Sequence, residues 1–214
     1  MKVIEIFASI EGEGKRAGQP CTFVRLAGCN LRCSYCDTKY SYDCAEYIEM
    51  TPLQIVDKLY KLQVPSITIT GGEPLIHQDI EKLLRLIEPA WEVNIETNGS
   101  IELFEVDPHP NMFYTVDYKC KSSGMSDRMI MERIAAQLTD VDVLKFVVGT
   151  QGDMEQALDI INKYKLDCSI YFSPVFGNID PKNIVKFLLD KNLYQCKVQV
   201  QLHKIIWDPN ERGV

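Results

Sequence analysis

Three cysteines lie close together in the segment RLAGCNLRCSYCDTKYSYDC, which covers residues 25–44. The spacing of Cys29, Cys33 and Cys36 lets one short loop present three thiolates to a soft metal centre. A structural zinc site uses four ligands, usually as two distant pairs, and the sequence has no second Cys-x-x-Cys pair. Three thiolates around an iron–sulfur cluster instead leave one iron open to a reactant. The loop therefore favours a catalytic cluster.

The other five cysteines are interpreted differently. Cys44 follows eight residues after Cys36 and could supply a fourth ligand, as in ferredoxins, but its distance makes this the less favoured reading. Four more lie in or beside apolar runs and are expected in the core as thiols: Cys21, Cys120, Cys168 and Cys196. Eight cysteines among 214 residues fall below the roughly 8–10% of a disulfide scaffold.

The composition narrows the possible partners. The net charge is -7 and no long basic block is present, which argues against binding to nucleic acid. No apolar run reaches the roughly 18 residues of a membrane span, and the first residues do not resemble a signal peptide. We expect a cytoplasmic protein without membrane contact that acts on a small molecule. The length predicts a single domain over residues 1–214.

Short β-rich runs alternate with helical patterns along the chain. Strands are predicted at 21–27, 66–70, 92–97, 112–118, 142–148, 168–172 and 197–202. Helices are predicted at 51–63, 78–88, 126–138, 152–164 and 180–191. This alternation predicts an α/β fold with a curved, mostly parallel sheet. The repeats are fewer than the eight of a closed barrel, so we expect a partial, open βα barrel.

Polar and glycine-containing segments follow the predicted strands. The cysteine loop follows 21–27, GGEP follows 66–70, and NGS follows 92–97. Because parallel α/β proteins bind ligands at the carboxyl ends of their strands, these segments are expected to meet at one site.

Two motifs together are similar to the radical S-adenosylmethionine (SAM) superfamily. These are Cys29-x3-Cys33-x2-Cys36, with Tyr35 before the last cysteine, and TGGEP at 70–74. The resemblance implies a core shortened relative to a full TIM barrel, with a [4Fe-4S] cluster on the three cysteines. It also implies that the open iron binds SAM. The radical would form on SAM, so no catalytic side chain is assigned.

The flanking segments resemble the 7-carboxy-7-deazaguanine synthase family of queuosine biosynthesis. They are SIEGEG, ETNG, KCKSSGM, FSPV and QLHKIIW. The resemblance implies a carbon–nitrogen lyase that converts 6-carboxy-5,6,7,8-tetrahydropterin to 7-carboxy-7-deazaguanine with loss of ammonia. It also implies Mg²⁺, an electron donor such as flavodoxin or ferredoxin, and a homodimer.

The resemblance assigns roles to individual residues. Thr38 would bind Mg²⁺. The residues implied on the SAM side are Tyr35, Cys36, Asp37, Gly72, Asp117, Tyr118 and Lys119. Those implied on the substrate side are Ile10, Glu11, Gly12, Arg25, Thr70, His203 and Val214. From the residues alone, Thr38 could instead cap a turn and His203 could be a core histidine.

Two positions depart from the family pattern. Glu11 stands where Gln is expected, and a carboxylate accepts but does not donate hydrogen bonds. Asp117-Tyr118-Lys119 stands where Ser-Pro-Lys is expected. Two other functions stay open: a radical SAM activase acting on a glycyl-radical protein, and an iron–sulfur or zinc module with a structural role.

Overall fold

A sheet of nine strands forms the centre of the computed structural model, which describes residues 1–42 and 46–214. Its order in the described part of the chain is β3-β1-β2-β4-β5-β6-β7-β8-β9. The strands are β1 (Lys2–Ile10), β2 (Pro20–Leu26), β3 (Ile48–Glu49), β4 (Ser66–Gly71), β5 (Glu92–Thr97), β6 (Met112–Lys119), β7 (Val143–Val148), β8 (Ser169–Pro174) and β9 (Cys196–Val198). The sheet is open, because β3 and β9 form its two edges.

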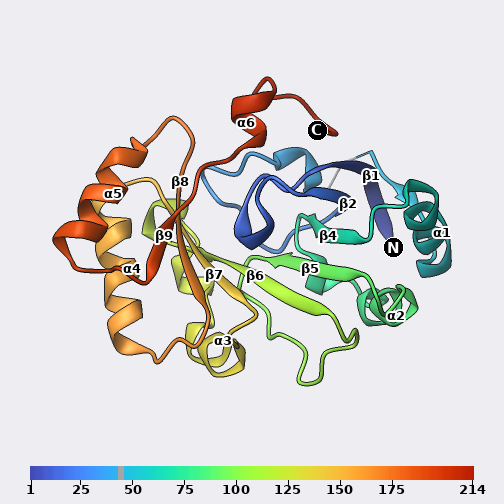
Figure 1. Ribbon diagram of the computed structural model, residues 1–214, viewed down its shortest axis with the longest axis horizontal. Helices are drawn as coiled ribbons and strands as arrows, with labels where there is room; N and C mark the ends of the chain where they lie inside the picture. Colours follow the sequence, from blue (N-terminus) through green and yellow to red (C-terminus); the bar gives the residue numbers. More distant parts are fainter. Residues whose placement is uncertain (43–45) are drawn as a thin grey trace.

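Most neighbouring strands are parallel. β2 and β4 to β9 pair in sequence order and in parallel, whereas β1 pairs antiparallel with β2 and β3. The α-helices are α1 (Pro52–Leu62), α2 (Ile80–Leu86), α3 (Met131–Gln137), α4 (Gln151–Lys163), α5 (Pro181–Asp190) and α6 (His203–Ile206). Helices α1 to α5 lie around the outside of the sheet, while α6 lies apart from them beside the C-terminus (Figure 1). The predicted α/β class and the open, mostly parallel sheet are confirmed.

The helices begin where the sequence supplies caps. The Thr51 side chain accepts a hydrogen bond from the Gln54 backbone, and the Gln54 side chain accepts one from the Thr51 backbone. This reciprocal arrangement satisfies backbone donors that have no partner within the helix. Thr150 and Asp153 form the same arrangement at the start of α4.

Side chains of successive strand residues alternate between the hydrophobic core on the outer face of the sheet and polar groups on its inner face. On β5, Val93 and Ile95 are fully buried in the hydrophobic core. The Asn94 side chain points to the opposite face of the sheet, where its oxygen accepts a hydrogen bond from the Thr115 hydroxyl of β6. Successive residues of a strand point to opposite faces, so Glu96 lies on the same face as Asn94. The outer face therefore packs against the helices, and the inner face carries polar groups.

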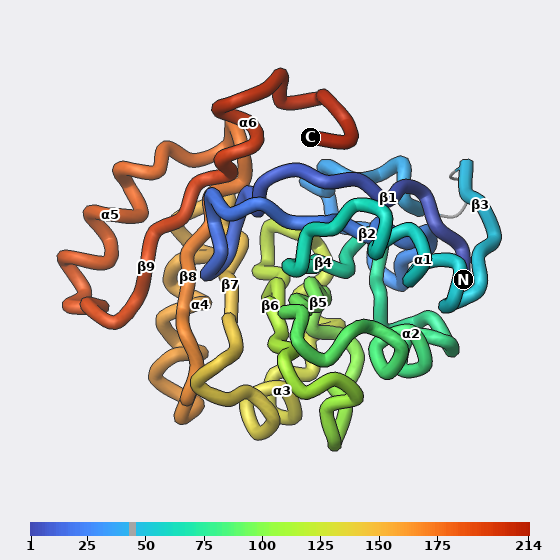
Figure 2. The backbone as a smooth tube through the Cα atoms, turned by 45° about the vertical axis from the view of Figure 1, so that its right-hand side comes forward, coloured from blue at the N-terminus to red at the C-terminus, as the bar shows by residue number. Residues whose placement is uncertain are grey.

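The loop between β1 and β2 folds towards this inner face. It contains a 3-10 turn, Gly14–Arg16, and the Arg16 guanidinium donates to the Ile67 carbonyl of β4 at 3.0 Å and to the Glu92 carbonyl of β5 at 3.4 Å. In Figure 2 this blue loop lies beside the upper end of β7, which its 3-10 turn contacts. The Arg16 side chain of this loop therefore lies against the first residues of β4 and β5.

The structure differs from the predicted elements at both ends of the chain. Strands β1 and β3 were not predicted, and the strand predicted at 197–202 is wrong beyond Val198. The Leu202 backbone N–H instead donates to the Gly12 carbonyl at 3.0 Å, and α6 begins at His203. Beyond Gln199, whose N–H still donates to the Phe172 carbonyl of β8 at 3.0 Å, contacts with the β1–β2 loop replace strand pairing. Among the described helices, none has the length and apolar character needed to cross a membrane.

Candidate active site

A cavity of about 900 Å³ opens among the carboxyl-terminal ends of the parallel strands, the cysteine loop and the C-terminal segment. The predicted site residues that line it are Ile10, Glu11, Gly12, Arg25, Cys29, Cys33, Tyr35, Cys36, Asp37, Thr38, Thr70, Gly72, Asp117, Lys119, His203 and Val214. The Tyr118 side chain does not line it. Tyr118 is buried against Phe146 on the opposite face of β6, where its hydroxyl accepts a hydrogen bond from Gln156.

Backbone hydrogen bonds help to hold the cysteine loop in place. The Gly28 N–H donates to the Ser41 carbonyl at 2.7 Å, and the Ser34 N–H donates to the Ser123 carbonyl at 3.0 Å. Cys29, Cys33 and Cys36 are free thiols. Cys44 lies outside the described residues.

The surroundings of the sulfur atoms suit a thiolate-bound cluster. The Leu31 N–H donates to Cys29 Sγ at 3.4 Å, and the Asn98 side-chain amide approaches the same sulfur at 3.8 Å. In the described part of the chain, no three His, Cys, Asp or Glu side chains are close enough to share a single metal ion. Cluster cysteines bind separate iron atoms and need not converge on one point. The N–H groups near Cys29 Sγ would stabilise a bound thiolate.

Gly72 lies where no side chain could be accommodated. A Cβ atom at this position would overlap the Gly28 carbonyl oxygen and press on Cβ of Cys29. The Gly72 N–H donates to the Leu26 carbonyl at 3.0 Å, and the Glu73 N–H donates to Gly28 at 2.8 Å. The glycine therefore lets the β4 turn pack directly on the cysteine loop.

Asp37 connects the cysteine loop to the C-terminal segment. Its carboxylate accepts a hydrogen bond from Lys204 Nζ at 2.8 Å and a longer one from the Gln201 amide at 3.4 Å. Burial acts to raise the pKa of Asp37, but the Lys204 ammonium outweighs it and the pKa is lowered. The side chain therefore carries its negative charge next to Cys36.

A row of alternating charges crosses the cavity floor. Lys119 Nζ lies 3.1 Å from Asp117 Oδ2, and Lys145 Nζ lies 2.8 Å from Asp117 Oδ1 and also contacts Glu13. Burial favours protonation of Asp117, but the two ammonium groups hold its pKa below the ordinary value. Sequence analysis gave no site role to Glu13, although it lies in the SIEGEG segment, or to Lys145, which belongs to no recognisable motif.

Glu96 is a further residue that sequence analysis missed. It lines the cavity at the end of β5, and its Oε2 atom accepts a hydrogen bond from the Thr70 hydroxyl at 2.8 Å. Burial raises the pKa of Glu96 to about 7 despite the opposing effect of Lys145. The available signal was a carboxylate one residue before the end of the strand EVNIET, in the segment expected at the site.

Glu11 forms a buried ion pair. Its Oε2 atom accepts hydrogen bonds from Thr68 Oγ1 and, at 3.3 Å, from Arg16 Nη2, and it also lines the cavity. Arg16 is only 4% exposed. Burial raises the pKa of Glu11, while Thr68 and Arg16 act to lower it. The charge introduced by Glu in place of Gln is thus balanced within the protein.

Arg25 lies on the wall formed by β2. Its Nε atom donates to Glu5 Oε1 at 2.6 Å, and its guanidinium lies 6.0 Å from the centre of the Tyr40 ring. The terminal Nη atoms make no hydrogen bond with a described residue. Arg25 therefore presents donors to the cavity in a fixed orientation.

The C-terminal segment completes the cavity from the other side. Residues 209–214 line it, and the Arg212 guanidinium stacks 3.9 Å from the centre of the Tyr40 ring. A side chain at Gly12 would collide with Nδ1 of His203, so the β1–β2 loop and α6 are in close contact. Burial lowers the pKa of His203. The Thr38 hydroxyl lies 3.6 Å from Cys36 Sγ.

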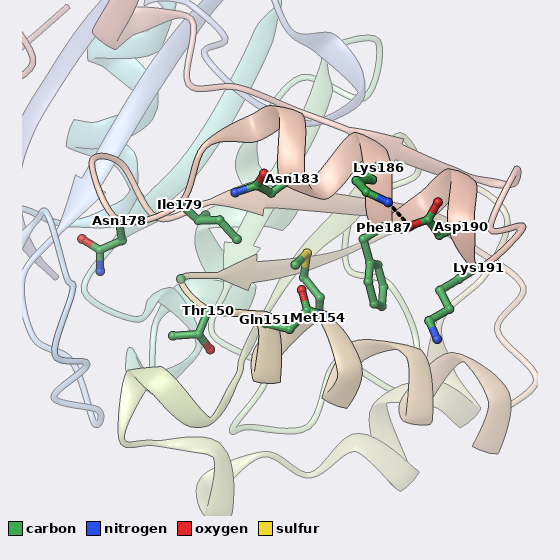
Figure 3. A pocket seen from close by; sticks show the side chains of 11 residues that line it. Thr150, Gln151, Met154, Asn178, Ile179, Asn183, Lys186, Phe187, Asp190 and Lys191 are labelled. Atoms are coloured by element: carbon green, nitrogen blue, oxygen red, sulfur yellow. Dashed lines mark hydrogen bonds and ion pairs between the residues drawn. The ribbon is translucent and has the colours of Figure 1, made fainter.

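A second hollow of about 600 Å³ lies between the start of α4 and the side of α5 (Figure 3). Thr150, Met154 and Asn183 line it, and Lys186 forms an ion pair with Asp190 at 2.5 Å along its rim. None of the predicted site residues lies in this hollow. The candidate site is therefore the larger cavity.

Comparisons with known proteins show which family the chain resembles. Residues 23–106 match the radical SAM superfamily. A 7-carboxy-7-deazaguanine synthase of Clostridium acetobutylicum is 43% identical, with 100% of this chain and 99% of that protein covered. The Methanospirillum hungatei enzyme of the same name is 37% identical, with 98% of this chain and 86% of that protein covered.

A solved structure shares the fold. The crystal structure of QueE from Escherichia coli superimposes with a TM-score of 0.74 at 22% identity, covering 94% of this chain and 93% of that one. Residues 23–106 match the radical SAM superfamily, and the whole chain aligns with the Clostridium enzyme at 43% identity. This chain is therefore a member of the 7-carboxy-7-deazaguanine synthase family of radical SAM enzymes.

Proposed function

We propose that the chain converts 6-carboxy-5,6,7,8-tetrahydropterin to 7-carboxy-7-deazaguanine with loss of ammonia. The observation that carries this proposal is a single cavity lined by both predicted sets of residues. The three cysteines and Gly72 line it together with Arg25, Glu11 and Thr70. A cofactor and a small substrate held in this cavity would be in direct contact.

Membership of the radical SAM superfamily implies a [4Fe-4S] cluster and SAM. We assign Cys29, Cys33 and Cys36 as the cluster ligands, supported by their free thiols and by the N–H groups near Cys29 Sγ. When bound, the cluster and SAM supply one-electron chemistry that removes a hydrogen atom from the substrate. We assign to SAM the side chains of Tyr35, Asp37, Asp117 and Lys119 and the backbone of Cys36, Gly72 and Tyr118.

On the substrate side, Arg25 is assigned to the substrate carboxylate. Glu5 fixes its Nε atom, which leaves the Nη atoms for the planar, two-point contact that a guanidinium makes with a carboxylate. The carboxylates of Glu11 and Glu96 are assigned as acceptors for the N–H groups of the pterin ring. Ile10, Gly12, Thr70, His203 and Val214 complete this side of the cavity.

The loss of ammonia requires proton transfer to the departing nitrogen. Glu96, with a pKa of about 7, can hold or release a proton near neutral pH, which is the condition for general acid–base catalysis. The C-terminal segment, stacked through Arg212 on Tyr40, covers the cavity and restricts water access. Exclusion of water protects reactive intermediates from side reactions.

We further infer a Mg²⁺ ion at Thr38. The hydroxyl of Thr38 lies at the cavity, and hard oxygen ligands with retained waters suit this ion. An external one-electron donor such as a flavodoxin or ferredoxin would be needed, because the sequence has no second cluster motif. We also propose a homodimer, which analytical ultracentrifugation would test.

The test is anaerobic reconstitution with iron and sulfide, followed by dithionite, SAM, Mg²⁺ and carboxytetrahydropterin. We expect 7-carboxy-7-deazaguanine and ammonia in equal amounts. Formation of 5′-deoxyadenosine without any deazapurine would overturn the proposed reaction. Radical formation only on addition of a partner polypeptide would favour the activase instead.

A further inference from the structure

Lys145 is a buried cation that the proposed function does not use. It lies on β7, its side chain is 4% exposed, and it lines the cavity floor. An ammonium group in such a position is unfavourable unless it is paired with negative charge. Lys145 therefore depends on its neighbours, and they depend on it.

Its partners come from separate elements of the fold. Glu13 belongs to the β1–β2 loop and contacts Lys145 Nζ directly. Asp117 lies on β6 opposite Lys145 in the strand register, with 2.8 Å between the charged atoms. Glu96, on β5, lines the same cavity as Lys145, and the Lys145 ammonium group acts to lower its pKa. One ammonium group thus connects three elements that reach the cavity.

The balance of charge on the floor depends on Lys145. Four carboxylates gather there: Glu11, Glu13, Glu96 and Asp117. Arg16 pairs with Glu11 and Glu92, and Lys119 pairs with Asp117. Among the described residues, Lys145 is the cation in contact with Glu13 and the leading source of positive charge at Glu96.

We propose that Lys145 is a positioning residue for the substrate: its ammonium group fixes the carboxylate of Glu13 and keeps Glu96 available to accept hydrogen bonds from the bound pterin. This inference rests on the proposed function, because it assumes that the cavity binds a pterin.

The electrostatics of Glu96 support the inference. Burial raises its pKa to about 7, Lys145 acts to lower it, and Glu11, Asp117 and Glu13 act to raise it. Removal of the ammonium group therefore raises the pKa of Glu96 further, and the carboxyl group stays protonated to a higher pH. Removal of the Glu13 charge has the opposite effect.

The experiment measures the dissociation constant of carboxytetrahydropterin by anaerobic equilibrium dialysis between pH 6 and 9. The variants are Lys145→Met, Glu13→Gln and, as a matched control, Lys191→Met at the end of α5 in the second hollow. Wild-type affinity should fall as the pH drops through about 7, because Glu96 becomes protonated.

In Lys145→Met we expect this fall to move to higher pH by about one unit, which weakens binding at pH 7 roughly fivefold and at lower pH up to about tenfold. In Glu13→Gln the fall in affinity should move to lower pH, and in Lys191→Met it should stay at the wild-type pH. The opposite shifts distinguish an electrostatic role from loss of packing. Glu13→Gln keeps the test decisive if Lys145→Met fails to fold.

Iron content and thermal unfolding of each variant check that the cluster and the fold are retained. An unchanged pH profile in folded Lys145→Met, or no opposite shift in Glu13→Gln, would overturn the role of Lys145. Absence of pterin binding by the wild-type protein would instead overturn the proposed function.

Discussion

The cysteine side and the charged floor of the cavity are built in different ways. The cysteine loop is a short contiguous segment, held by backbone hydrogen bonds such as those of Gly28 and Ser34. The charged floor is assembled by side chains far apart in the chain, and Glu13 and Lys145 are separated by 132 positions. A contiguous loop brings its cysteines together by their spacing in the chain, whereas a charge-built floor responds to pH and to the loss of any partner.

The largest effect is expected on the cysteine side. Cys33→Ala should abolish cluster binding and all 5′-deoxyadenosine formation, because one iron loses its thiolate. Iron and sulfide analysis after reconstitution measures the first effect, and chromatography measures the second. Cys168→Ala, at a cysteine just before β8, is the matched control and should retain both. Retained brown colour and turnover in Cys33→Ala would remove Cys33 from the ligand set.

A smaller effect is expected on the charged floor. Glu96→Gln should leave the cluster intact but weaken pterin binding roughly 10- to 100-fold at pH 8, since hydrogen bonds to charged groups contribute about 1.5–3 kcal/mol. The variant should also lose the fall in affinity below pH 7 that protonation of Glu96 causes in the wild type. If Glu96→Gln kept the wild-type pH profile, another group would be responsible.

An intermediate effect is expected at Thr38, which lies two residues after Cys36. Thr38→Val keeps the shape of the side chain but removes the hydroxyl, so it should spare the cluster and require about tenfold more Mg²⁺ for half-maximal turnover. A Mg²⁺ titration of product formation is the measurement. Thr38→Ser, which retains the hydroxyl, should behave like the wild type. An identical Mg²⁺ response in Thr38→Val would exclude Thr38 from the ion site.

The smallest effect is expected at the connection between Asp37 and Lys204. The Asp37 side chain is 51% exposed and that of Lys204 is 8% exposed, and ion pairs with a solvent-exposed partner contribute about 0.2–1 kcal/mol. Lys204→Met should therefore raise the KM for SAM less than about fivefold, and Lys204→Arg should raise it less. A rise in the KM for SAM of more than a hundredfold in Lys204→Met would show that the connection between Asp37 and Lys204 is essential to SAM binding.

The sequence predicted the parallel part of the fold with small errors. The strand predicted at 92–97 is β5, and the helix predicted at 51–63 contains α1. These elements are specified locally, by hydrophobic pattern and by caps such as Thr51. Strand β1 was missed, and residues 199–202 were predicted as strand. Both errors concern segments whose conformation depends on partners distant in the chain.

The residues of the candidate site also fall into a group that local sequence predicts and a group that depends on the tertiary structure. The amino-acid sequence was sufficient to predict roles for Cys29, Cys33, Cys36 and Gly72, because the spacing of neighbouring residues and the absence of a side chain are local properties. It could not identify the partners of Glu11, Glu13, Glu96 and Lys145. Those pairings exist only because parallel strands and the β1–β2 loop bring distant charges into one poorly solvated space, where burial and Coulomb interactions determine their protonation.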